Sequence, residues 1–468
     1  MKKNEVLNTG LLKEMSKKKI SFHSPGHKGK IDMMNEDFFE MDSVSDIDSG
    51  AYGLAGKSYL TMSQNKAANL YRSERVFYLA NGATSGIYTM LTLCTKAGDK
   101  IIVDRNCHKS VINAIVLLGL IPVFITGTYI SKYDFCAGIT SDDVIEAINH
   151  HSDAAAVFIT SPSYYGVVSD VKSIANVCHE NNMYLLVDEA LGGHFSFSQR
   201  LPASATRLGA DMVVQSISKT LGAISGTGIL HVNTNDFMSE KIKETINMYQ
   251  TSSPSYALYA HTEKTIDAAF KFADKYKAIV KTIEKYAAYV NKYSNAYWID
   301  SKINDIVFDK DTTKVVINFS NTSLSGYDVA KALYEKYAIE TEIASFLNIT
   351  ASVSVYNKTS DIKKLAEAVV AIVGRSVKSE AEFKTRNPVH NLKIIPRDAF
   401  FAEGENVPIS ESLGRISKNI VGRYLSGAPI LVPGEEITEL HIRAICDCEG
   451  EYVEGIREDL SIEVVKKS

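Results

Sequence analysis

The chain has 468 residues, of which 45% are hydrophobic and 23% are charged, and its formal net charge is -4 at pH 7. This is the composition of a globular protein with a large core, and the slightly acidic balance predicts no binding to nucleic acid or to anionic membranes. The sequence has no run of about 18 apolar residues and no apolar core near its start, so we predict neither a membrane span nor a secretory signal.

The first 55 residues are rich in turn formers and predict an irregular N-terminal arm. From residue 73 to residue 232, short apolar strands alternate with helices. The expected strands are 76–79, 100–103, 121–125, 154–159 and 184–187, and the clearest helices are 109–118 and 171–181. Short apolar strands separated by helices predict an α/β domain with a mainly parallel sheet that is covered on both faces.

Residues 236–294 predict long helices. Beyond them, strands at 314–319 and 339–343 and helices at 326–337 and 362–373 predict a small α+β domain. The charged segment 378–391 predicts a surface linker, and a last α+β unit follows. We therefore expect four parts: an N-terminal arm at 1–55, a large domain at 56–300, a small domain at 301–380 and a C-terminal domain at 381–468.

Four polar segments follow predicted strands, where ligands bind in parallel α/β sheets. The first is Asn81-Gly82-Ala83-Thr84-Ser85-Gly86, which opens a helix. The backbone N–H groups of Ala83, Thr84 and Ser85 could hold a phosphate at that helix N-terminus. Such loops are also common as plain helix caps.

The second and third segments each contribute one side chain that could meet a planar cofactor. His108 follows the strand at 100–103, and its ring could stack on such a cofactor, although a loop histidine is more often a surface or capping residue. Asp188 ends the strand at 184–187. A buried carboxylate needs a partner, and a protonated pyridine nitrogen would serve. A helix N-cap is an equally good explanation for Asp188 taken alone.

The fourth segment is Gln215-Ser216-Ile217-Ser218-Lys219-Thr220, followed by glycines. A lysine in an apolar setting can lose its proton and form an imine, and the hydroxyls of Ser216 and Ser218 could contact a phosphate. An exposed lysine is the ordinary alternative for any single residue of this kind.

The order of the four segments favours one cofactor, pyridoxal 5′-phosphate (PLP). Lys219 would form the Schiff base, Asp188 would pair with the pyridinium, and His108 would stack on the ring. The pyridinium would act as an electron sink for an amino-acid substrate, and Lys219 would later move protons.

We predict no metal site, because Cys446 and Cys448 lack a second Cys/His pair at zinc-finger spacing. The six cysteines are too few for a disulfide scaffold and predict reduced thiols in the cytoplasm.

Several stretches resemble the fold-type-I ornithine/lysine/arginine decarboxylases, in the shorter bacterial form without a wing domain. They are FHSPGHKGK at 22–30, DRNCHKS at 104–110, LVDEALGGHF at 186–195, the lysine-bearing segment 201–231, PRDAFFAEGENVPISESLGRI at 396–416 and GAPILVPGEEIT at 427–438. The resemblance implies a PLP-binding, transferase-like large domain and a decarboxylase that releases CO₂ and a polyamine-type amine. It also implies a homodimer or a higher homo-oligomer with an active site shared between subunits, and it places an acidic residue, Glu342, in the small domain.

The sequence departs from this family at Leu191 and Ser218, where the family usually has histidine. Leu191 cannot form a hydrogen bond to a cofactor or substrate. These departures leave open a second hypothesis, in which the fold carries a different PLP-dependent reaction such as transamination, oxidation or elimination. A third hypothesis is a catalytically silent homologue that regulates a true decarboxylase. For Glu342, an exposed strand residue is the alternative to a substrate contact.

Overall fold

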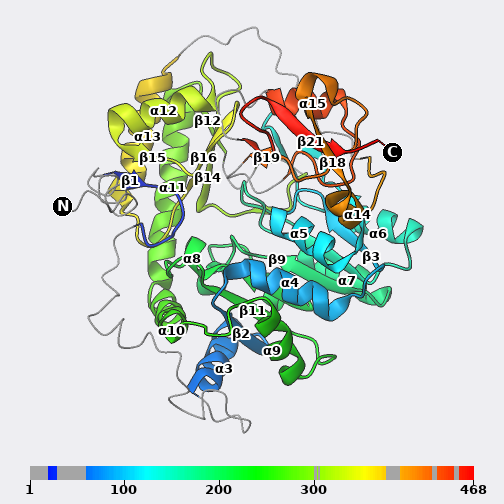
Figure 1. The fold of residues 1–468 in the computed structure, drawn as a ribbon. Helices are drawn as coiled ribbons and strands as arrows, with labels where there is room; N and C mark the ends of the chain where they lie inside the picture. The colour runs from blue at the N-terminus through cyan, green and yellow to red at the C-terminus, as the bar shows by residue number, and fades with distance from the viewer. Residues whose placement is uncertain are drawn as a thin grey trace, which may run out of the picture.

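The computed structural model describes residues 19–28, 59–299, 303, 306–375, 391–423, 429–446 and 453–467. Figure 1 shows three units: a large α/β domain, a smaller α+β unit drawn in yellow-green, and a C-terminal unit drawn in orange and red. The predicted surface linker at 378–391 lies almost entirely outside the described residues, as does most of the predicted arm at 1–55.

A seven-stranded sheet forms the centre of the large domain, with strand order β2-β11-β10-β9-β7-β3-β4. Every neighbouring pair is parallel except the two pairs that β11 makes. The strands are β2 (Arg75–Leu79), β3 (Lys100–Asp104), β4 (Ile121–Ile125), β7 (Ala156–Thr160), β9 (Tyr184–Asp188), β10 (Met212–Gln215) and β11 (Gly228–Val232). The prediction of a mainly parallel α/β sheet is therefore confirmed. Because the link between β10 and β11 is short, it returns the chain antiparallel instead of crossing over.

Helices cover both faces of this sheet, since alternate residues of each strand point to opposite sides. Ile101 and Val103 of β3 pack into one core with α4 and α5, whereas Ile102 packs into the other core with α6 and α7. The helices are α4 (Gly82–Cys94), α5 (Lys109–Leu118), α6 (Ser141–His150), α7 (Val171–Glu180) and α9 (Ser239–Met248). The helix predicted at 109–118 is confirmed at both ends. One further helix, α3 (Tyr59–Tyr71), packs beside β2.

The small unit is an antiparallel four-stranded sheet in the order β12-β14-β17-β16, covered by two helices. Its elements are β12 (Tyr297–Ile299), β14 (Lys314–Asn318), β16 (Ile343–Ala344), β17 (Asn348–Ser352), α12 (Gly326–Tyr337) and α13 (Thr359–Val373). Two long helices, α10 (Tyr256–Lys271) and α11 (Ala273–Tyr293), precede it. Because β12 and α11 pack within this unit, the unit begins before residue 301.

The strand predicted at 339–343 is divided in the structure. Its first part, β15 (Ile339–Glu340), pairs in parallel with β1 (Ile20–Ser21) from the N-terminal segment. Its second part is β16, which pairs with β17. Residues 19–28 are therefore tied to the small unit, and this brings the FHSPGHK motif close to the large domain, as described below.

The C-terminal unit surrounds a small apolar core and packs against α5 of the large domain. Its elements are α14 (Pro396–Phe401), β18 (Gly404–Pro408), β19 (Gly422–Arg423), α15 (Glu439–Cys446), β20 (Val453–Glu454) and β21 (Ser461–Val465). Arg105, at the end of β3, joins the two units through a buried ion pair with Glu435, at 3.0 Å, and also donates to the backbone oxygen of Pro429. Cys448 of the Cys446–Cys448 pair lies outside the described residues.

Removing one partner of the buried Arg105–Glu435 ion pair is expected to lower the stability of the protein strongly. Its side chains are only 3% and 0% exposed, so Glu435→Ala leaves an uncompensated buried charge, which destabilises a protein by about 3–5 kcal/mol. We expect a loss of that size in urea unfolding. The matched control is Glu454→Ala, which removes the half-exposed Lys109–Glu454 pair between the same two units and should change stability by less than about 1 kcal/mol. Equal effects of the two variants would contradict the prediction.

Candidate active site

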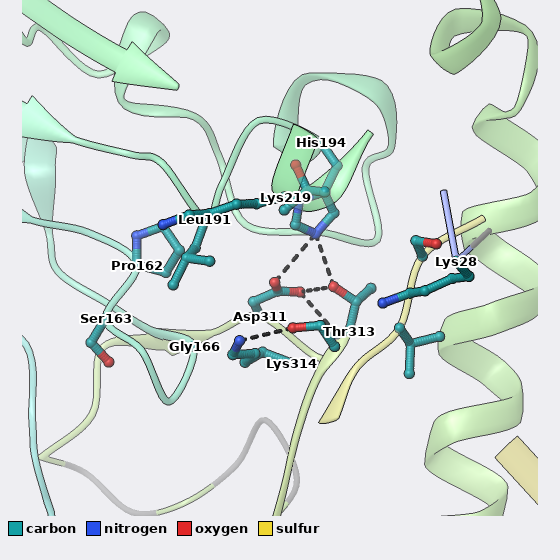
Figure 2. Close-up of a pocket in the computed structure, with 14 residues that line it drawn as sticks. Lys28, Pro162, Ser163, Gly166, Leu191, His194, Lys219, Asp311, Thr313 and Lys314 are labelled. Atoms are coloured by element: carbon teal, nitrogen blue, oxygen red, sulfur yellow. Dashed lines mark hydrogen bonds and ion pairs between the residues drawn. The ribbon is translucent and has the colours of Figure 1, made fainter. Parts of the chain in front are cut away.

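The candidate site is a pocket between the large domain, the small unit and the N-terminal segment. Its walls come from all three parts (Figure 2). The lining residues are Lys28, Pro162, Ser163, Gly166, Leu191, His194, Lys219, Thr220, Asp311, Thr313, Lys314, Ser352, Val353 and Ser354. The pocket lies at the carboxyl ends of β7, β9 and β10, as ligand sites do in sheets of this kind.

Lys219 lies on α8 (Ile217–Thr220), directly after β10, and reaches the pocket. Burial lowers the pKa of its ammonium below the ordinary value, whereas the charges of Asp188 and Glu342 oppose this shift and that of Lys314 adds to it. A lowered pKa increases the fraction of neutral amine, the form that attacks a carbonyl carbon. The arrangement predicted for Lys219 at the end of a buried strand is therefore present.

Asp188 is the last residue of β9 and is 4% exposed. Burial raises the pKa of its carboxyl group, while the charge of Lys219 and a hydrogen bond from the Ala190 N–H, at 2.9 Å, counteract the rise. It does not cap a helix of the described chain, because a turn follows it. A buried carboxylate in this setting is suited to a cationic partner such as a protonated ring nitrogen.

His108 is the N-cap of α5, and its Nδ1 accepts the backbone N–H of Ser110 at 3.2 Å. The proton of the neutral ring is therefore on Nε2. Burial, together with the charges of Lys219 and Lys109, lowers the pKa of His108 to about 4. The ring is therefore uncharged at neutral pH. His108 caps α5 through Nδ1, and its ring also presents a flat, neutral surface near Lys219.

The loop that the sequence predicts to bind a phosphate lies at the start of α4. The N–H of Gly82 donates to the oxygen of Gly226, and the fully buried Ser85 hydroxyl donates to the oxygen of Gly82 at 2.9 Å. The first-turn N–H groups of Ala83 and Thr84 have no acceptor within the helix. A Cβ on Gly228 would lie 3.0 Å from the Ala83 nitrogen and 3.2 Å from the Gln215 oxygen, so this loop adjoins the end of β10.

Ser216 and Ser218 lie on the same turn as Lys219. Their hydroxyl oxygens are 3.2 Å apart and hydrogen bonded, and both residues are buried. The structure thus brings the Ser-x-Ser-Lys segment and the α4 loop to the same end of the sheet. This is the arrangement that the sequence predicts for a phosphate group.

The FHSPGHK motif packs directly on the lysine segment. The N–H of Gly26 donates to the oxygen of Ser218 at 2.8 Å, and a Cβ on Gly26 would lie 3.0 Å from the Lys219 oxygen. Only glycine allows two backbones to approach so closely. The N-terminal motif therefore forms part of the pocket wall.

Glu342 is buried, with 9% of its surface exposed, and the expectation of an exposed strand residue is wrong. Its carboxylate pairs with Lys314 Nζ at 2.5 Å and accepts hydrogen bonds from the hydroxyls of Ser352 and Ser24. Burial opposes its ionisation, but the charge and hydrogen bond of Lys314 outweigh burial and lower its pKa to about 2. Lys314 also lies 4.7 Å from the ring centre of Tyr164.

Two features of the site have only a faint signal in the sequence. Leu191 lines the pocket, so its side chain makes this wall apolar. His194, in the same LVDEALGGHF motif, bonds to Asp311 and Thr313 of the small unit (Figure 2). The motif quotes His194, but the sequence gives no sign of its partners, because those residues come from a segment without any recognisable pattern.

Glu189, next to Asp188, anchors the end of β9 through hydrogen bonds to its buried carboxylate. It accepts hydrogen bonds from the Ala205 N–H at 2.7 Å, the Ser204 hydroxyl at 2.6 Å and the Gln215 amide at 2.5 Å. Burial raises the pKa of Glu189 to about 7. Because Gln215 is the last residue of β10, this network fixes the ends of β9 and β10 relative to each other, and with them Asp188 and the segment of Lys219.

A mainly parallel sheet with a buried lysine and aspartate at its carboxyl edge defines the fold-type-I class of PLP-dependent enzymes. The structure resembles the Francisella novicida lysine decarboxylase, with a TM-score of 0.76 and 17% identity over 93% of this chain and 76% of that one. Residues 6–335 match the family model described as the major domain of Orn/Lys/Arg decarboxylases. The chain therefore belongs to the Orn/Lys/Arg decarboxylase family, as its motifs predicted.

Relatives within this family match almost the entire chain. The chain is 31% identical to the arginine decarboxylase of Bacillus subtilis, over 94% of this chain and 92% of the relative. It is 32% identical to the arginine decarboxylase of Halalkalibacterium halodurans, over the same shares of the two chains. The prediction of a decarboxylase is confirmed at the level of the family.

Within the described residues, no helix is long and apolar enough to cross a membrane, and no group of three His, Cys, Asp or Glu side chains is arranged to hold a metal ion.

Proposed function

We propose that the protein is a PLP-dependent decarboxylase that converts a basic amino acid, namely arginine, lysine or ornithine, into an amine and CO₂. The observation that carries this proposal is the convergence of Lys219, Asp188 and His108 at one end of the sheet, where the charge of Lys219 acts on both of the other side chains. Membership of a decarboxylase family supports the reaction, and the names of the relatives support the substrate class.

The residues at the site fit PLP. A buried carboxylate at Asp188 suits a pyridinium N–H, a neutral His108 ring suits stacking, and the N–H groups of Ala83, Thr84 and Ser85 with the hydroxyls of Ser216 and Ser218 suit a phosphate. When bound, PLP supplies an electron sink that stabilises negative charge at the substrate Cα. Lys219 would hold the cofactor through its Nζ, and Asp188 would keep the proton on the ring nitrogen.

The chain's own residues also line the proposed substrate pocket. Lys28, Leu191 and Val353 form part of its wall, and a substrate that displaced water from the pocket would strengthen the electrostatic interactions there. The carboxylates of Asp311 and Glu342 lie on the small-unit side of the site, and we propose that they attract the cationic end of the substrate. Because Lys314 already pairs with Glu342, that substrate group would share the carboxylate with Lys314.

The second candidate is another PLP-dependent reaction on the same fold. The apolar side chain of Leu191 in the pocket wall favours it, because the family's usual histidine at this position would offer a hydrogen bond there. The same cofactor residues would then serve transamination, oxidation or elimination.

Incubation with a mixed pool of amino acids, followed by mass spectrometry, separates these functions. We expect an amine and CO₂ from at least one of arginine, lysine and ornithine. A keto acid without CO₂ would overturn the decarboxylase proposal and favour transamination. No turnover of any amino acid would indicate a silent homologue.

We further propose a cytoplasmic homodimer that contributes to polyamine biosynthesis. The free thiols of Cys94, Cys107 and Cys178 support a reducing compartment, and active sites shared between two subunits are usual in this class of enzyme. Size-exclusion chromatography with light scattering tests the dimer, and a monomeric mass would contradict it.

A further inference from the structure

A second cavity lies at the edge of the central sheet opposite to Lys219. It has a volume of about 480 Å³ and lies between the end of α3, α7 and the loops around η2 (Ala205–Arg207). Because it includes residues that directly precede β10 and directly follow the antiparallel β11, it lies at the amino ends of the parallel strands. We call it the arginine pocket. Its polar and charged lining residues are Arg72, His179, Thr206, Arg207, Asp211 and Asn233.

The two arginines of this pocket lie close together without a carboxylate partner. Among the described residues, the Arg72 side chain makes no hydrogen bond or ion pair, and the Arg207 side chain makes one hydrogen bond, to the backbone oxygen of Ser196 at 3.4 Å. Burial and the charge of Arg72 lower the pKa of Arg207, so the two cations are near enough to repel each other. The exposed Arg200, by contrast, pairs with Glu284 at 2.7 Å.

The carboxylate in the pocket wall is already engaged. Asp211 is the single acidic residue among the described lining residues. Its Oδ2 lies 3.1 Å from Nε2 of His179 and accepts the backbone N–H of Leu185 at 2.8 Å. Asp211 therefore holds α7 and the start of β9 in place, and the charges of Arg72 and Arg207 are left for a ligand.

The segment that carries Arg207 is fixed on both sides. The Ala205 N–H donates to the carboxylate of Glu189 at 2.7 Å, and the amide of Asn233 donates to the backbone oxygen of Thr206 at 3.3 Å. These partners directly follow β9 and β11, so η2 is tied to the central sheet. A charged group on a rigid support loses little conformational freedom when a ligand binds.

Arg72 has a backbone conformation that glycine would adopt more easily. Its φ is +59°, in the left-handed region, directly after the last residue of α3. Glycine and asparagine are the usual residues at such helix ends, because a larger side chain strains this conformation. The described chain gives the Arg72 side chain no partner that would offset the strain, whereas an anion in the arginine pocket would do so.

We propose that the arginine pocket binds the phosphate group of a small phosphorylated molecule through Arg72 and Arg207. A guanidinium presents its N–H groups as a planar fork that matches two phosphate oxygens. A phosphate monoester carries close to two negative charges on one group, so it can neutralise two neighbouring cations at once.

The size of the pocket favours a ligand with an organic part. The cavity falls within the range of small-molecule sites and is much larger than a phosphate ion. Because the arginine pocket lies apart from the pocket of Lys219, this site does not depend on the reaction proposed there.

Isothermal titration calorimetry at low ionic strength tests this site. The protein is first saturated with PLP and freed of the excess, so that the predicted phosphate position beside Ser216 and Ser218 is filled. We expect glycerol 3-phosphate to bind with a Kd below about 1 mM, and inorganic phosphate and the dicarboxylate succinate to bind at least about tenfold more weakly. Equal affinity for inorganic phosphate would overturn the organic ligand and assign the site to the free ion. Tighter binding of succinate, or no binding of either phosphate, would overturn the proposal.

Two variants separate binding from folding. Arg72→Gly removes one guanidinium and places glycine at a positive φ, so this variant should unfold at a temperature no lower than the wild type. Arg207→Gln removes the other guanidinium. We expect each variant to bind glycerol 3-phosphate at least about tenfold more weakly, with an unchanged basal enzymatic rate.

The matched control is Arg443→Gln, which removes an exposed arginine of α15 outside the arginine pocket and should bind glycerol 3-phosphate like the wild type. Wild-type affinity in folded Arg72→Gly and Arg207→Gln proteins would overturn the proposal. An equal loss in Arg443→Gln would also overturn it, because the binding would then reflect the overall charge of the protein.

Discussion

Replacing Lys219 by alanine is expected to remove the cofactor attachment and to reduce decarboxylation at least about 10³-fold, since the variant loses both its nucleophilic amine and a proton carrier. Protein loaded with PLP should absorb near ~420 nm, as expected when the cofactor is bound covalently to an amine. Lys219→Ala should lack this band. The physical reason is the environment of the lysine: burial lowers its pKa, which increases the fraction of neutral amine at the end of β10.

The matched control for this variant is Lys172→Ala, an exposed lysine on α7 that lies outside the pocket. It should keep both the absorbance and the rate. Circular dichroism and thermal unfolding show whether Lys219→Ala is still folded. An unchanged band in a folded Lys219→Ala protein would show that the cofactor is attached elsewhere, and would remove the basis of the proposed function.

The large domain could be predicted because its strands carry strong local signals. The runs at 100–104 and 184–188 are apolar on both faces, which is the pattern of a buried parallel strand, and helices with clear periodicity separate them. The antiparallel direction of β11 carries no such signal. The division of residues 339–344 into two strands depends on partners far away in the chain, Ile20 and Ser21 for one and Ile349 and Thr350 for the other.

The difference between local sequence patterns and contacts with distant parts of the chain also explains how much of the site could be predicted. Asp188 and Lys219 follow buried strands directly, so their position at one edge of the sheet follows from the order of the chain. Asp311 and Thr313 reach the pocket only because the small unit packs against the large domain, and no local pattern shows that packing. Arg105 belongs to a recognisable motif, but its partner Glu435 lies 330 residues away, so its structural role could not be read from the motif.

The buried pair of Lys314 and Glu342 gives the second large effect. Because folding lowers the pKa of Glu342 from 4.5 to about 2, its ionised form stabilises the protein at pH values above 4.5. This contribution is lost as the pH falls through about 2, and the shift corresponds to roughly 3 kcal/mol. Urea unfolding at pH 6 and at pH 3 should therefore show an acid-induced loss of stability that is larger in the wild-type protein than in Glu342→Gln, where the buried Asp311, whose pKa is also lowered, still contributes.

At neutral pH, Glu342→Gln leaves the ammonium group of Lys314 buried without its counter-charge, which should destabilise the protein by about 3–5 kcal/mol. The unpaired cation would also repel the positive end of a basic substrate, so we expect KM for that substrate to rise at least about tenfold. The double variant Lys314→Met/Glu342→Met removes both charges and should regain most of the stability, because an apolar pair can replace a buried ion pair. It should not regain the low KM, since the carboxylate proposed to attract the substrate is gone. Recovery of both properties in the double variant would show that Glu342 serves only the fold and that the substrate's charge is recognised elsewhere in the pocket.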